Sequence, residues 1–247
     1  MLYEAAMVFG LFSKEKSLQR TIERATNKLA QQADRWGALE KLREDGSDEA
    51  LFGLCKRWSI TSNNNVEDQQ EKAWVVDVLT AKGAAVLGPL GRYLKSAPQL
   101  SYALAVVGAV ADKAQAFALI DPILADETPG YTRDPERRLD LIRWLGEWKD
   151  GGADATKRLV PYLKDFDQNV RVAAADAIAD ADPALTAEPL LAAFLRPEEE
   201  SGRFRKRIAE ILAKHHHPLG EHAATVASLL TGPVAGFAVT GGQLVER

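Results

Sequence analysis

The chain has 247 residues, of which 46% are hydrophobic and 27% charged, and its formal net charge is −4. This composition is that of an ordinary soluble protein, and the acidic balance makes nucleic acid an unlikely partner and anionic lipid a poor one. The longest apolar run, residues 102–111, is too short to cross a bilayer, so no transmembrane segment is expected. The single cysteine, Cys55, excludes an internal disulfide and fits a reducing, cytoplasmic location.

The first twelve residues are apolar, but Glu4 and the absence of a preceding basic residue disfavour a secretory signal. We expect this segment to pack on the open end of the first helix pair. The alternative is weak contact with a membrane interface, to which Lys14 and Lys16 would contribute. We therefore separate an apolar N-terminal segment, 1–16, and leave its flexibility open.

Apolar residues recur three and four apart along most of the chain, which predicts amphipathic helices. Residues 17–31 have a narrow apolar stripe that suits an end cap, and Asn65 is expected to cap the helix that follows it. The other helices predicted in this half are 33–44, 48–60, 66–81, 84–95, 99–111 and 113–125. The polar link 126–133 is the place where a loop is expected to project.

One pattern then occurs three times, at intervals of 33 and 34 residues. Each copy is a polar residue followed, four positions later, by an arginine and then by apolar residues at helical spacing. The polar residues are Asp134, Asp167 and Ser201, and the arginines are Arg138, Arg171 and Arg205. A period in this range is typical of stacked helix pairs.

A proline marks the first helix of each unit. The prolines are Pro89, Pro122, Pro161 and Pro189, at intervals of 33, 39 and 28 residues. Proline inside a helix removes a backbone hydrogen bond and clashes with the preceding turn. Four occurrences at about one repeat spacing therefore predict a shared bend.

Together these motifs resemble those of the HEAT-repeat family of armadillo-like proteins, over roughly residues 34–230. The resemblance implies an all-α, right-handed α-solenoid of about five to six helix pairs, which we assign to residues 17–231. It also implies a structural ladder between neighbouring repeats. The ladder residues would be Asp134, Arg138, Asp167, Arg171 and Arg205.

The pattern changes after residue 230. Residues 236–245 read as two short strands around Gly241-Gly242, which predicts a β-hairpin within a C-terminal tail, 232–247. A lone hairpin is marginally stable in water, so it is expected to dock on the last helix pair or on a partner.

Two groups of residues are candidates for chemistry. The histidines between His215 and His222 are adjacent on the chain, and we expect a solvated helix end there rather than a metal site. Trp144, Glu147 and Trp148 have the spacing of one helix face. The interpretation as core tryptophans is favoured over a DNA-binding arrangement, and neither a cofactor nor a metal is expected.

A partner is expected to bind the polar face of the later helices. The proposed partner-binding residues are Arg143, Glu147, Arg203 and Arg207. The register places Asp176 and Asp180 on the same face, so its charge is expected to change from acidic in the middle repeats to basic in the last.

No catalytic residues are predicted, because the sequence has no phosphate-binding loop, paired cysteines or nucleophile–base pattern. The sequence therefore predicts a non-enzymatic scaffold or adaptor that binds a protein on its concave face. The alternative is an enzyme on a HEAT-like scaffold, either an alkylpurine DNA glycosylase-like protein or a chromophore lyase-like protein. The partner's identity and the oligomeric state stay open.

Overall fold

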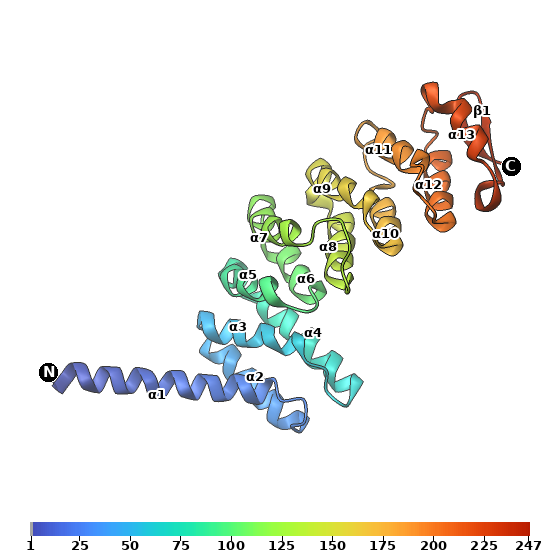
Figure 1. Cartoon of the computed structure of the whole chain (residues 1–247). Coiled ribbons are helices and arrows are strands. Elements are labelled where there is room, and N and C mark those ends of the chain that lie inside the picture. The colour runs from blue at the N-terminus through green and yellow to red at the C-terminus, as the bar shows by residue number, and fades with distance from the viewer. Residues whose placement is uncertain (1) are drawn as a thin grey trace. The chain divides into compact units, whose positions relative to one another are not determined.

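The computed structural model describes the backbone of residues 2–247 and the side chains from residue 14 onward. Over this range the chain forms 13 α-helices and ends in a two-stranded antiparallel sheet (Figure 1). The helical class and the C-terminal hairpin agree with the sequence prediction. The chain divides into two compact units, which we call the first unit (1–123) and the second unit (124–247) and describe separately.

The first unit contains six complete helices and the larger part of a seventh. Their bounds are α1 Leu2–Ala25, α2 Gln32–Asp45, α3 Asp48–Lys56, η1 Arg57–Ser59, α4 Asn65–Ala81, η2 Gly83–Val86, α5 Leu87–Ser96, α6 Ser101–Val110 and α7 Lys113–Asp126. Gly46 ends α2 with a φ of 61°, a conformation that glycine adopts without strain. Ser47 and Asn64 cap α3 and α4, so the cap of α4 lies one residue before the expected Asn65.

The first helix differs most from the prediction. It runs from Leu2 to Ala25, so the expected boundary at residue 16 falls inside it. The helix ends before Asn27, whose side chain accepts a hydrogen bond from the Leu29 backbone at 3.0 Å and favours a turn. Leu29, which was expected on the apolar stripe, is 75% exposed. The expected packing or membrane contact of residues 1–12 lies outside the described side chains, and no helix of the described part is long and apolar enough to span a membrane.

The helices of the first unit pack in two alternating rows. The odd-numbered α1, α3 and α5 contact one another in succession, as do the even-numbered α2, α4 and α6. Trp58 is 2% exposed and contacts the rings of Tyr93 and Tyr102 at centroid distances of 5.6 and 6.1 Å. Cys55 is also fully buried, and burial raises the pKa of its thiol to about 12.

The second unit continues the alternation of helices. Its elements are α8 Glu136–Glu147, η3 Lys149–Gly151, α9 Gly152–Leu159, η4 Val160–Lys164, α10 Gln168–Ile178, α11 Pro183–Leu195, α12 Gly202–Lys214, η5 Gly220–His222, α13 Ala223–Leu229 and η6 Gly232–Val234. Asp167, Asp182 and Ser201 accept backbone hydrogen bonds at the starts of α10, α11 and α12. The repeated polar residue therefore acts as a helix cap.

The repeated prolines occupy two kinds of position. Pro122 and Pro189 lie inside α7 and α11, whereas Pro89 and Pro161 lie in the first turns of α5 and η4, the latter directly after the end of α9. In the helix interior the missing N–H removes a helical hydrogen bond, whereas the first turn of a helix tolerates proline. The shared bend that the sequence predicts is thus replaced, at Pro161, by a change from α-helix to 3₁₀-helix.

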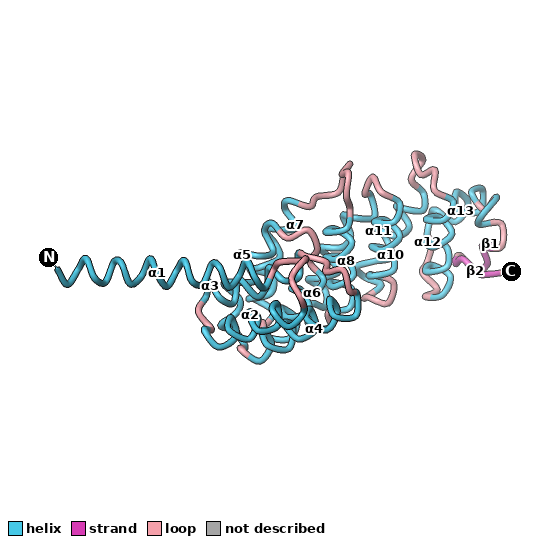
Figure 2. The backbone as a smooth tube through the Cα atoms, turned by 90° about the horizontal axis from the view of Figure 1, so that it is seen from below, coloured by secondary structure: helices cyan, strands magenta, loops and turns pink. Residues whose placement is uncertain are grey.

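Helices α8, α10 and α12 lie side by side in Figures 1 and 2 and contact one another in succession. Gly146 permits the close approach of α8 and α10, because a Cβ atom at this position would lie 2.6 Å from the Cβ of Ala177. Helices α9 and α11 contact each other in the same way and form the second row. The second unit therefore also consists of two rows of helices.

The hairpin consists of β1 Phe237–Thr240 and β2 Gln243–Glu246, with Thr240 opposite Gln243. Gly241 and Gly242 have φ values of 61° and 77°, which the tight turn requires. Strand β2 contacts α12, and Leu244 is fully buried. Of the two docking places expected from the sequence, the structure shows the one on the last helices.

Candidate interaction site

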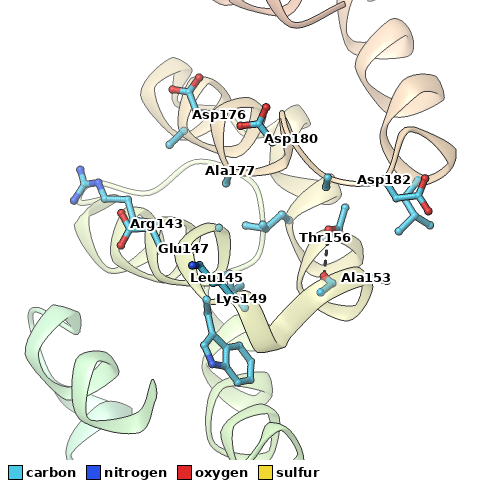
Figure 3. Close-up of a pocket in the computed structure, with 17 residues that line it drawn as sticks. Arg143, Leu145, Glu147, Lys149, Ala153, Thr156, Asp176, Ala177, Asp180 and Asp182 are labelled. Carbon is cyan, nitrogen blue, oxygen red and sulfur yellow. Dashed lines mark hydrogen bonds between the residues drawn. The ribbon is translucent and has the colours of Figure 1, made fainter. Parts of the chain in front are cut away.

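A pocket of about 590 Å³ lies in the second unit (Figure 3). It is formed by the last turn of α8, by η3 and α9, by α10, and by the start of α11. These elements are consecutive along the chain, so the pocket follows from the packing of successive helices on one another. Its size is within the range of sites that bind small ligands or single anchoring side chains.

The lining is mixed in character. Its apolar part includes Leu145, Trp148, Leu159, Ala177 and Leu185. The charged lining residues are Arg143, Glu147, Lys149, Asp176, Asp180 and Asp182. Carboxylates are therefore twice as frequent as cations around an apolar interior.

The tryptophans of α8 are not core residues. Trp144 and Trp148 are both half-buried and stack on each other, with a centroid distance of 4.8 Å and an interplanar angle of 19°. The reason is the register of α8, which directs Leu141, Ile142 and Leu145 into the core. The tryptophans lie at the edge of this stripe, and Trp148 forms part of the pocket wall.

Only two of the four expected partner-binding residues line the pocket. Arg143 and Glu147 do, and they project from the same face of α8. Arg143 is 57% exposed and its Nη1 lies 3.7 Å from the Asp140 carboxylate, which is outside the lining. Arg203 and Arg207 lie on α12 and do not line the pocket.

The expected charge gradient is replaced by pairing between α10 and α12. Arg203 donates to Asn169 at 2.8 Å, and Lys214 donates to Asp180 at 2.8 Å. Arg207 donates to Asp176 in the same way. These partners are 31 to 34 residues apart, which is one repeat. The acidic and basic side chains of this face therefore largely neutralise each other.

The pKa shifts follow this pairing. The Lys214 ammonium holds the pKa of Asp180 below its usual value, first through a hydrogen bond and then through its charge. The hydrogen bond to Asp176 raises the pKa of Arg207. Asp180 thus remains ionised, and Asp176 and Asp180 each have a cation beside them.

The repeated arginines do connect neighbouring helices, although with other carboxylates than the expected ones. Arg138 donates to Asp165 at 2.6 Å, and Arg171 donates to Glu199 at 2.8 Å. We call these two pairs the arginine ladder. Asp165 and Glu199 precede the caps of α10 and α12 by two residues and are 34 residues apart.

The expected aspartates have a different role because their side chains face their own helices. Asp134 accepts a hydrogen bond from the Glu136 backbone, and Asp167 accepts two from the start of α10. A cap engaged in this way does not reach the arginine. Arg205, the third ladder candidate, donates to the Arg196 carbonyl at 3.0 Å and has no carboxylate partner in the described part of the chain.

Sequence reasoning missed a network of charged side chains buried in the first unit, which we call the buried charge network. Its members are at most 4% exposed; they are Arg35, Arg57, Asp68, Glu71 and Lys72. Glu71 accepts from Arg57 at 2.6 Å and from Arg35 at 2.9 Å. Asp68 accepts from Arg57 at 2.8 Å and lies 2.7 Å from the Lys72 ammonium.

The ionisation of the network is held by these contacts. Burial by itself would raise the pKa of Asp68, but hydrogen bonds from Lys72, the Ser62 backbone and Arg57 hold it at about 2. The hydrogen bond to Glu71 raises the pKa of Arg35. With every member at most 4% exposed, the network has a structural role. Such groups are poorly placed to meet a substrate.

The histidine cluster is only in part the solvated helix end that was expected. His217 is 2% exposed, and its Nε2 has no hydrogen-bond partner among the residues that the structure describes. Burial, and then the charge of His215, lowers the pKa of His217. His215 Nε2 lies 3.2 Å from the Asp180 carboxylate. Within the described residues, no group of three histidine, cysteine or acidic side chains is arranged to hold a metal ion.

Comparisons with protein-family models, with curated proteins and with solved structures find no match to this chain.

Proposed function

We propose that the chain is a non-enzymatic interaction scaffold whose helix pairs form a HEAT-like, right-handed α-solenoid. The support comes from the second unit, where α8, α10 and α12 contact one another in succession and equivalent residues pair at one repeat spacing. The observation that carries the proposal is the pocket formed where the successive helices α8 to α11 pack on one another. Stacked repeats characteristically present such surfaces to protein partners.

The proposal includes a reducing, cytoplasmic location. Its support is Cys55, which is free and fully buried. The proposed partner is a protein. The arginine ladder and the buried charge network have structural roles in this proposal. Neither requires a cofactor for its role.

The test is capture of a partner by the immobilised full chain, followed by measurement of affinity and stoichiometry with the purified partner. We compare the wild type with Glu147→Arg, which alters the pocket rim, and with Glu136→Arg, which alters an exposed position of α8 outside the lining. The scaffold should bind one partner at a defined stoichiometry, and Glu147→Arg alone should weaken binding. Equal binding by all three proteins, or retention no better than on an unrelated helical protein, would contradict the proposal.

A glycosylase-like activity is the second candidate, because Trp148 and Glu147 line one pocket. An aromatic wall and a carboxylate are the groups that the resemblance to HEAT-like alkylpurine glycosylases implies. Against it, the lining has more carboxylates than cations, which opposes a DNA backbone. Release of a base from alkylated duplex DNA, abolished by Glu147→Gln, would favour this candidate over the scaffold.

A further inference from the structure

We propose that the pocket of the second unit takes the cationic side chain of a lysine or arginine carried by an extended segment of the partner. The inference rests on the proposed scaffold function and names the chemistry of its binding site. It follows from the charges that remain uncompensated in the lining, from the apolar wall beside them, and from the occupants that this combination disfavours.

The lining carboxylates differ in whether a cation pairs with them. Asp176 and Asp180 are paired with Arg207 and Lys214 of α12. Glu147 has no ion-pair or hydrogen-bond partner among the described side chains, and Asp182 only accepts the Ala184 backbone N–H as the cap of α11.

The cations of the lining do not offset these two carboxylates. Arg143 lines the pocket, but its guanidinium lies near Asp140, which is outside the lining. Lys149 is then the one lining cation without a carboxylate partner among the described residues. Two carboxylates without a cationic partner among the described residues therefore share the lining with one cation that has no carboxylate partner there, and the local field favours an incoming positive charge.

The pocket also has an apolar wall. Trp148 lines the pocket together with Leu185 and Ala177. The methylene stem of lysine or arginine packs on such a surface while its charged end stays near carboxylates. The indole ring adds an attraction for a cation placed over its face.

Other kinds of occupant fit this lining less well than a basic side chain. An anionic group would meet Glu147 and Asp182, the two lining carboxylates without a cationic partner among the described residues. A purely apolar group would cover Glu147 without compensating its charge, which is unfavourable. A metal ion is disfavoured because the described residues include no suitably arranged group of three ligands. A basic side chain satisfies both the carboxylates and the wall.

The probes for the experiment are N-acetyl-arginine methylamide and N-acetyl-citrulline methylamide, which have nearly the same shape and differ in charge. Each is titrated into the ¹⁵N-labelled full chain, and amide and indole signals are followed. The arginine probe should shift the signals of Trp148 and Gly152 with a millimolar dissociation constant, and the citrulline probe should bind about tenfold more weakly or not at all.

Two pocket variants test which lining carboxylate attracts the arginine probe. Glu147→Gln and Asp182→Asn should each weaken the arginine probe severalfold, and asparagine keeps the cap of α11. Glu136→Gln, outside the lining, should leave affinity unchanged. Because either pocket variant suffices, misfolding of one, visible in its spectrum, does not prevent the test.

Equal binding of the two probes, undiminished binding by both pocket variants, or no shift up to about 50 mM probe would overturn the inference. The scaffold proposal would survive that result if the full chain still captured a partner. Conversely, selective arginine binding without any protein partner would contradict the scaffold proposal and leave the chemistry of the pocket standing.

Discussion

The two units connect their successive helices with buried charges in different ways. The first unit gathers five charged side chains into one network around Glu71, which joins α2, η1 and α4. The second unit distributes its buried charges over separate pairs, Arg138 with Asp165 and Arg171 with Glu199, although Glu199 also pairs with the partly exposed Arg196. Each pair of the ladder serves one junction, whereas the network serves several elements together.

The difference shows what each arrangement tolerates. Burying charges is unfavourable unless every group is paired, and removal of one partner leaves the others uncompensated. Loss of Glu71 leaves two buried arginines without their shared carboxylate, but loss of a ladder arginine leaves one carboxylate, and Glu199 would still keep Arg196 as a partner. The first unit should therefore be the more sensitive to point substitution.

Glu71→Gln should have the largest effect. The amide cannot compensate Arg35 and Arg57, so the free energy of unfolding of the first unit should fall by about 3–5 kcal/mol. Urea unfolding followed by tryptophan fluorescence measures this loss. Asp77→Asn on the same helix, at an exposed position, serves as the control and should change stability by less than about 0.5 kcal/mol. A loss of similar size in both variants would contradict the role of the network.

Arg171→Met should come next. It removes the pair with Glu199 and two hydrogen bonds to the carbonyls of Asp165 and Phe166, for an expected loss of about 2–3 kcal/mol. Arg205→Met is the matched control, since Arg205 donates to one carbonyl and has no carboxylate in the described chain. Its loss should be about 1 kcal/mol, and an equal loss at both positions would argue against the ladder.

The pH dependence of the second unit should reflect His217. Its folded-state pKa lies below the ordinary value of 6.5 because the ring is buried. The unfolded chain therefore binds a proton more readily, and stability is retained above pH 6.5 and declines as the pH falls below it. Denaturant unfolding of the wild type and of His217→Gln, between about pH 7.5 and pH 5, measures the effect. The decline should be smaller in the variant, and identical profiles would show that His217 does not titrate on unfolding.

Reversal of Arg203 and Arg207 to glutamate should have the smallest effect on stability. Both side chains are at least partly exposed, and pairs of this kind contribute at most about 1 kcal/mol. The loss should shrink further as salt is raised. A cooperative loss of the fold would mean that the α10–α12 contact depends on these charges. Partner association should slow only if the partner reaches α12, because neither residue lines the pocket.

Much of the local structure could be predicted because it depends on short-range chemistry. The caps of α10 and α12, and the Gly241-Gly242 turn, follow from residues that form the turn or cap themselves. The burial of Trp58 follows likewise from the sequence, because its neighbours at helical spacing, Leu51 and Leu54, are apolar. The end of α1 was misplaced because the turn at Asn27 competes with a continuing amphipathic pattern.

The buried charge network was missed because charged residues usually mark the solvated face of a helix. One signal was present in the sequence. Asp68, Glu71 and Lys72 lie on the same helical stripe as Val75 and Leu79, which are fully buried. The ladder carboxylates were misassigned for a related reason, since the repeat marks the caps but not which carboxylate the arginine reaches across the junction. The pocket depends on packing between five elements, and only Arg143 and Glu147 of its lining were singled out from the sequence as partner-binding residues.

The central claim is that the helix pairs form an extended repeat scaffold, and small-angle X-ray scattering of the monodisperse full chain tests it most directly. A compact globule of this length has a radius of gyration of roughly 18 Å. The proposed solenoid predicts a clearly larger value and a pair-distance distribution with the long tail of an elongated particle. A radius of gyration near 18 Å, with a symmetric distribution, would contradict the account.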